Sequence, residues 1–170
     1  MRSNRRKREK SNFQLIHCEK MYSPTCENCS VVSDMSEVVY FNEDGKKHGE
    51  EKEYREDGSL KRSIPWVNGK KHGEEKWFNE DGSLWGSTPF VDGKKHGEQK
   101  EYRKDGSLKR SISWLAGEKH GEEKWFNEDG SLRRSIPFVD GKKHGEQKEY
   151  RKDGLIYRLS YNQGVINLSG

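Results

Sequence analysis

The chain has 170 residues, of which 28% are hydrophobic and 36% are charged, and its formal net charge is +4. So little apolar material argues against a compact globule built around one interior. A single-layer repeat protein needs less apolar mass, because much of its surface stays in contact with water.

Residues 1–12 form a basic leader with six basic residues and one acidic residue. We expect a disordered, solvated terminus, and the alternatives are binding to nucleic acid or to an anionic membrane through these charges. No apolar run follows that could act as a signal peptide or a transmembrane segment. This pattern favours an intracellular, cytoplasmic protein, with a virion as the alternative location.

Residues 13–40 contain all three cysteines and are expected to form an N-terminal cap segment. Cys18, Cys26 and Cys29, with His17, supply four possible zinc ligands. There is only one Cys-x-x-Cys pair, and the adjacent His17 and Cys18 are awkward ligands for one tetrahedral site. Free thiols packed in a cap are therefore favoured over zinc, and no other cofactor is expected.

Residues 41–154 form an array with a period of 24 residues, which is carried by three glycine columns. The first column begins with Gly45 and Gly69, and the second with Gly49 and Gly73. The third, in which aspartate always precedes glycine, contains Gly58, Gly82, Gly106, Gly130 and Gly154. Asp-Gly between two strand-like runs predicts a hairpin turn, because glycine adopts positive φ at little cost. We expect a tight turn at the third column and a longer turn at Gly-Lys-Lys-His-Gly.

The segments between the glycines alternate as strands do. Leu60, Ile64 and Trp66 share one parity, which predicts a strand with one buried face. Arg62 falls on the same parity and is expected to reach out to water. Pro65 predicts a bulge or a site without a ladder hydrogen bond. The predicted fold is all-β, an elongated single-layer sheet of consecutive antiparallel hairpins.

A second period of 48 residues overlies the first, because Glu53 and Glu101 alternate with Trp77 and Trp125. Large and small residues therefore exchange places between adjacent units. This alternation predicts that neighbouring units compensate for each other in packing.

The succession of Asp-Gly, an aromatic residue, Asn/Asp-Gly-Lys-x-His-Gly-Glu and a second aromatic residue resembles the MORN-repeat family. More closely, it resembles the 24-residue variant found in YwqK-type antitoxins and in repeat proteins of large DNA viruses, and the resemblance covers about residues 41–168. The resemblance implies a solenoid-like row of β-hairpins. It also implies scaffolding, protein binding or membrane association, without one shared chemistry.

Residues 155–170 are expected to form a C-terminal capping hairpin with a turn at Asn162-Gln163-Gly164. The alternative is an open edge that pairs with a partner strand.

The positions that recur in each unit of the array suggest few functional sites. Successive histidines would lie about 10 Å apart, too far to share a metal ion, so a turn-stabilising role is predicted for His72, His96 and His120. The lysine pairs could form a basic ridge for a partner or a solubilising rim: Lys70, Lys71, Lys94, Lys95, Lys142 and Lys143. Trp85 stands outside the aromatic columns, in a unit that also departs from the others at Gly86 and Thr88, and is the strongest single candidate for an exposed contact.

No nucleophile elbow, phosphate loop or unique carboxylate pair is present. The favoured function is a non-enzymatic scaffold that binds a protein partner along its sheet face, with virion assembly as one form of that role. An antitoxin-like protein that neutralises a toxin enzyme by direct binding is one alternative. A membrane or nucleic-acid binder that acts through residues 1–12 is the other.

Overall fold

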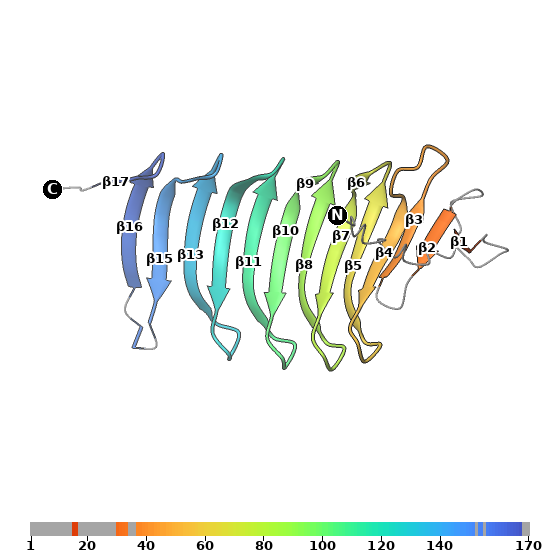
Figure 1. The fold of residues 1–170 in the computed structure, drawn as a ribbon. Helices are drawn as coiled ribbons and strands as arrows, with labels where there is room; N and C mark the ends of the chain where they lie inside the picture. The colour runs from red at the N-terminus through yellow and green to blue at the C-terminus, as the bar shows by residue number, and fades with distance from the viewer. Residues whose placement is uncertain (1–14, 17–29, 34–36, 152, 155, 168–170) are drawn as a thin grey trace, which may run out of the picture.

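The computed structural model describes residues 15–16, 30–33, 37–151, 153–154 and 156–167. These residues form one antiparallel sheet of 17 strands, with no helix among them. Figure 1 shows the strands side by side in a single open layer, roughly in chain order from the N-terminal to the C-terminal end. The prediction of an all-β sheet of consecutive hairpins is confirmed.

Each 24-residue unit contributes one hairpin of two long strands. The five hairpins are β4 (Gly49–Tyr54) with β5 (Leu60–Val67), β7 (Gly73–Phe78) with β8 (Leu84–Val91), β10 (Gly97–Tyr102) with β11 (Leu108–Leu115), β12 (Glu118–Phe126) with β13 (Leu132–Val139), and β15 (Gly145–Tyr150) with β16 (Ile156–Asn162). Short strands pair with the end of the preceding long strand: β6 (Lys70–Lys71), β9 (Lys94–Lys95), β14 (Lys142–Lys143) and β17 (Val165–Ile166). The sheet begins with β1 (Leu15–Ile16), β2 (Ser30–Ser33) and β3 (Glu37–Phe41).

The tight turn and the longer loop lie at the opposite glycine columns from those that the sequence predicted. The tight two-residue turn lies at the first glycine column, where Asn68 and Gly69 both have positive φ, 49° and 81°. Two successive positive-φ residues match the twist of a hairpin. The Asp-Gly of the third column instead lies in a longer loop, in which the Arg55 amide donates to Ser59 and the Ser59 amide donates to the Asp57 carboxylate. The prediction was wrong because both turns need a glycine at positive φ, so the dipeptide alone does not distinguish them.

The register explains the irregular positions. The pairing of β4 with β5 shifts by one residue between Glu53 and Tyr54, next to the long loop. The pairing of β11 with β12 shifts between Ile112 and Trp114. Ser113 lies at that second shift and is the equivalent of Pro65, so proline stands where the ladder between units is interrupted.

The two faces of the sheet differ in chemistry. Opposed residues share a face, and the pairs Glu51–Ile64, Glu53–Arg62 and Gly49–Trp66 place these side chains together. This face, with its equivalents in every unit, is called the ladder face. The opposite face carries Glu50, Lys52, Ser63 and Pro65 and their equivalents, and is called the serine face.

The most buried apolar side chains lie on the ladder face. Ile64, Ile112 and Ile136 are 3–5% exposed. Opposite these isoleucines lie the buried carboxylates of Glu51 and Glu123, and the buried carboxylate of Glu75 lies opposite Thr88. A one-layer sheet cannot cover an apolar face with a second layer, so long charged side chains of adjacent units provide the cover.

The last hairpin is built differently from the others. It pairs β15 with β16 without a register shift. As after the other hairpins, a tight turn follows, here at Gln163 and Gly164, which both have positive φ and join β16 to β17. Ile156, Tyr157 and Leu159 of β16 are exposed.

Candidate functional site

A row of lysines and aromatic rings crosses the ladder face. In each unit a lysine at or just before the start of the first long strand lies over a ring on the second long strand of the same hairpin. The distances from Nζ to the ring centroid are 5.0 Å for Lys47 and Trp66, 4.9 Å for Lys71 and Phe90, 4.4 Å for Lys95 and Trp114, 4.8 Å for Lys119 and Phe138, and 4.8 Å for Lys143 and Tyr161. These are cation–π distances, so the row is held by electrostatic attraction as well as by packing.

Each of these lysines also contacts the side chain four residues further on. Nζ of Lys71 lies 2.8 Å from Glu75, and Nζ of Lys119 lies 2.6 Å from Glu123. The equivalent of these glutamates is glutamine in two units. There Lys95 Nζ donates to Gln99 at 3.1 Å and Lys143 Nζ to Gln147 at 3.4 Å.

Lys95 therefore has no carboxylate at the position where Lys71 and Lys119 have one. Burial lowers the pKa of Lys95 below its ordinary value, and repulsion from Lys119, Lys71 and Arg110 acts in the same direction, against the attraction of Glu75. Lys95 thus lies near three other cations without the carboxylate that Lys71 and Lys119 have four residues further on.

A second row alternates arginine, tryptophan and glutamate. The guanidinium carbon of Arg62 lies 4.3 Å from the ring centroid of Trp77, and Arg110 lies at the same distance from Trp125. Arg62 also donates to Glu75. These arginines were expected to reach water, and that expectation was wrong: each is held between the aromatic ring and the carboxylates of its neighbours.

Glu123 shows how tightly this row is connected. It accepts hydrogen bonds from Arg110, from Lys119 and from the indole of Trp125. Burial raises the pKa of Glu123, but the hydrogen bonds from Lys119 and Arg110 outweigh burial and hold it below the ordinary value. The carboxylate is therefore ionised and already paired at neutral pH.

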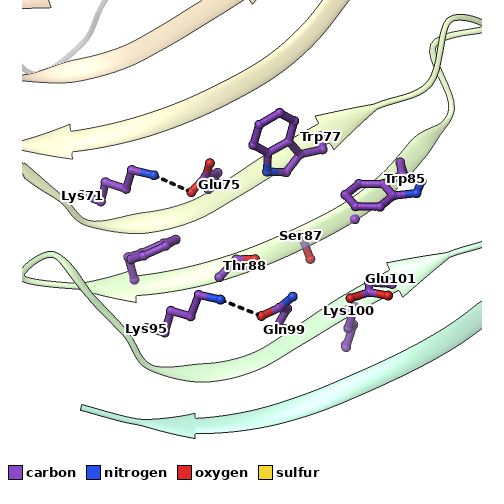
Figure 2. A pocket seen from close by; sticks show the side chains of 12 residues that line it. Lys71, Glu75, Trp77, Trp85, Ser87, Thr88, Lys95, Gln99, Lys100 and Glu101 are labelled. Atoms are coloured by element: carbon purple, nitrogen blue, oxygen red, sulfur yellow. Dashed lines mark hydrogen bonds and ion pairs between the residues drawn. The ribbon is translucent and has the colours of Figure 1, made fainter. Parts of the chain in front are cut away.

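The row is interrupted in one unit. Gly86 stands where Arg62, Arg110 and Arg134 stand in other units, and Thr88 stands where three units have isoleucine. A hollow of about 360 Å³ lies here, lined in part by Trp77, Trp85 and Glu101. Figure 2 shows Trp77, Trp85 and Glu101 toward one end of this hollow and Lys71 and Lys95 toward the other.

The predicted lysine ridge is divided between the two faces, because consecutive residues of a strand point in opposite directions. The first lysine of each predicted pair is exposed: Lys70, Lys94 and Lys142. The second is half-buried on the ladder face: Lys71, Lys95 and Lys143. Trp85 is 48% exposed. Whether these residues contact a partner stays a prediction.

The histidines lie beside the tight turns. Nδ1 of His72 is 3.7 Å from Asp92, and Nδ1 of His120 is 3.4 Å from Asp140, each in the next unit. His96 donates through its backbone amide to Pro89. Their predicted role in the turns stays a prediction. The third-column glycines all have positive φ: Gly58, Gly82, Gly106, Gly130 and Gly154.

The proposed zinc ligands Cys18, Cys26, Cys29 and His17 lie outside the described residues, as does the leader 1–12. Within the described ranges, no group of three or more histidine, cysteine or acidic residues could hold a metal ion. Within the same ranges, no helix has the length and apolar character needed to cross a membrane.

An open sheet of repeated hairpins with matching rows of side chains defines a β-repeat protein. The family model described as the MORN repeat variant matches residues 47–68, 71–92, 95–115 and 119–140. The chain belongs to this family, so the resemblance seen in the sequence is confirmed.

The comparison with curated proteins found no match. Among solved structures, the chain is similar to a crystal structure of an S. aureus TarM mutant in complex with Fondaparinux, alpha-GlcNAc-glycerol and UDP. The identity is 13% and the TM-score is 0.38, over 69% of this chain and 21% of that one. The chain thus spans about a fifth of that structure, and a likeness this distant carries no functional argument.

Proposed function

We propose that this protein is a non-enzymatic repeat scaffold that binds a protein partner along the ladder face. The observation that supports the proposal is the arrangement of that face, where rows of aromatic, arginine and lysine side chains are fixed by contacts between units. Aromatic residues and arginine dominate binding hot spots, and side chains that are already ordered lose little conformational entropy on binding.

The serine face offers less for binding. Its central rows are short serines and Lys–Glu pairs such as Lys124 with Glu122, 2.7 Å apart. Exposed ion pairs of this kind contribute little to affinity. The chemistry of the two faces therefore favours the ladder face as the contact surface.

The test is to capture partners with the full chain, identify them by mass spectrometry, and then map the interface by hydroxyl-radical footprinting. We expect the partner to protect ladder-face rings such as Trp66, Trp114 and Trp125. Pro65 and Pro137, which lie on the serine face opposite Glu50 and Glu122, should stay as reactive as in the free chain and serve as the internal control.

Protection of Pro65 and Pro137 in place of the tryptophans would contradict the proposal. So would a partner whose binding is lost on deletion of residues 1–12 and leaves the ladder face unprotected. A virion subunit and a toxin enzyme are two forms of the proposed partner, and the identity of the captured protein distinguishes them.

A further inference from the structure

Two stretches of this chain are almost identical, and their differences are concentrated at the hollow. Residues 73–106 and 121–154 differ at three positions only. Trp85, Gly86 and Thr88 in the first stretch correspond to Arg133, Arg134 and Ile136 in the second. The second stretch is thus a natural control for the first.

The register shows what the three differences do. Gly86 stands opposite Trp77 on β7 and opposite Glu101 on β10. In the second stretch, Arg134 stands in the same way between Trp125 and Glu149. Thr88, opposite Glu75, is shorter than its counterpart Ile136. The hollow is therefore lined by two positions, 86 and 88, whose side chains are smaller than those of their counterparts Arg134 and Ile136.

The missing side chain is an arginine in a row where arginines have constant neighbours. Arg62 lies between Glu53 and Trp77. Arg110 lies between Glu101 and Trp125. Gly86 has the same two kinds of neighbour, an indole on one side and a carboxylate on the other, but offers no side chain to lie between them.

We propose that the hollow over Gly86 receives the guanidinium of an arginine side chain supplied by the bound protein. This inference rests on the proposed function and specifies what one contact on the ladder face recognises. The incoming guanidinium lies between Glu101 and Trp77, on whose ring Arg62 already stacks at 4.3 Å. This is the place that Arg134 has between Trp125 and Glu149, where its buried Nε makes no hydrogen bond. Trp85, which replaces Arg133, borders the same end of the hollow and removes a positive charge from its rim (Figure 2).

The contacts of Glu101 suit this role. Its Oε1 accepts a hydrogen bond from Arg110 at 3.3 Å. A carboxylate has about four acceptor positions on its two oxygens, so Glu101 can accept from a second guanidinium. A planar guanidinium stacks on an indole and bonds a carboxylate at once, which a compact, strongly hydrated ammonium does less well.

Lys71 and Lys95 lie at the far end of the hollow, whereas Lys100, at the tryptophan end, is already paired with Glu98 at 3.3 Å. Repulsion from Lys71 and Lys95 disfavours a cation at the far end. The guanidinium is therefore placed at the tryptophan end, and a carboxylate guest near Lys95 is the competing possibility that the experiment must distinguish.

The test uses the full chain labelled with ¹⁵N, in which five tryptophans give five indole signals. N-acetyl-arginine amide is the probe. We expect it to shift the indole signals of Trp77 and Trp85, assigned from Trp77→Phe and Trp85→Phe spectra, and to leave those of Trp66 and Trp114 in place. The neutral citrulline analogue should bind roughly tenfold more weakly, because it loses the cation–π and ionic contacts.

The matched variant combines Trp85→Arg, Gly86→Arg and Thr88→Ile, which copies the sequence of residues 133–136 into a unit with the same flanking sequence. Because the chain already folds this sequence once, the variant is expected to fold, and it should lose the probe-induced shift at Trp77. The reciprocal variant, Arg133→Trp with Arg134→Gly and Ile136→Thr, should gain a shift at Trp125.

Three results would overturn the inference: equal binding of the arginine and citrulline probes, a shift that persists in the matched variant, or preferential binding of N-acetyl-glutamate amide. The experiment needs no partner protein. A negative result with the arginine probe would exclude arginine binding in the hollow, but it would not change the footprinting result. The proposal that a partner binds the ladder face is therefore tested independently.

Discussion

The guanidinium of Arg110 lies 4.3 Å from the ring centroid of Trp125, in the next unit of the sheet, and donates to Glu123 beside it. One side chain thus connects two hairpins through an aromatic ring and a buried carboxylate. In a sheet with one layer, such contacts between units take the place of an interior.

Arg110→Lys should therefore lower the free energy of unfolding although the charge is kept. Lysine cannot form the planar stack and the forked hydrogen bonds together, so we expect a loss of about 1–2 kcal/mol. Urea unfolding measures this change. Lys109→Gln, at an exposed neighbouring position, is the control and should change stability by less than about 0.5 kcal/mol. Equal effects of the two substitutions would mean that stacking contributes nothing.

Glu123 makes stability depend on pH. Its pKa is held below the ordinary value of 4.5, so the folded chain binds this proton less readily than the unfolded chain. The stabilisation is present above the ordinary value and is lost as the pH falls through the lowered value. Glu50 and Glu122, whose pKa values are also lowered, act in the same direction.

Glu123→Gln should cost about 1–3 kcal/mol at pH 7, because Arg110 and Lys119 lose an ionised partner. A glutamine side chain fits at this position, because Gln99 and Gln147 occupy the equivalent positions in other units. Unfolding by urea at about pH 7 and about pH 3 should show the difference from the original protein shrinking as the pH falls. A difference that does not change with pH would show that the charge of Glu123 is not the cause.

Gln99→Glu gives Lys95 the carboxylate that Lys71 and Lys119 already have. We expect a gain of about 0.5–1 kcal/mol at neutral pH and a rise in the pKa of Lys95 toward its ordinary value. Urea unfolding and NMR titration of the lysine side chain measure the two effects. Glu is isosteric with Gln, so lower stability would mean that burying the new charge costs more than the ion pair contributes.

Thr88→Ile should fill part of the hollow and stabilise the sheet by about 1 kcal/mol, as expected for added buried methylene. Ile64, Ile112 and Ile136 are accommodated at the equivalent positions. Thr88→Val, which removes the hydroxyl without adding length, is the matched control, and thermal unfolding compares the two. If valine and isoleucine stabilise equally, the gain comes from loss of the hydroxyl and not from filling space.

Among the described residues, five other than glycine have positive φ, and Ala116, with a φ of 51°, is the only one of these that is not asparagine, aspartate or glutamine. Asparagine tolerates this left-handed conformation better than alanine does. Ala116→Asn should therefore raise the free energy of unfolding by about 0.5–1 kcal/mol, and Ala116→Val should lower it. Chemical unfolding of both variants tests the sign, and a destabilising asparagine would contradict the turn geometry described here.

The sequence was sufficient to predict the hairpins, because their signals are local. The Asp-Gly and Asn-Gly dipeptides mark the turns, and the alternation of Ile64 with Trp66 marks a strand with one buried face. The class of each turn was not predictable in this way, since Asp57-Gly58 and Asn68-Gly69 satisfy the same local requirement for positive φ.

The ladder face was only partly predictable, because its contacts join residues of different units. The partner of Arg62 depends on the register that brings Trp77 opposite it, and that register follows a shift in pairing near Pro65. The three unusual residues Trp85, Gly86 and Thr88 were visible in the sequence. The hollow was not, because it depends on Gly86 standing between Trp77 and Glu101.

The alternation of Glu53 and Trp77 along the array also governs how its length can change. Insertion of one 24-residue unit after Arg62 would place a residue other than tryptophan opposite this arginine. Insertion of two units, which is one full 48-residue period, would keep tryptophan opposite it. Growth or loss of the array by 48 residues at a time is therefore the change that this sheet tolerates with least disturbance.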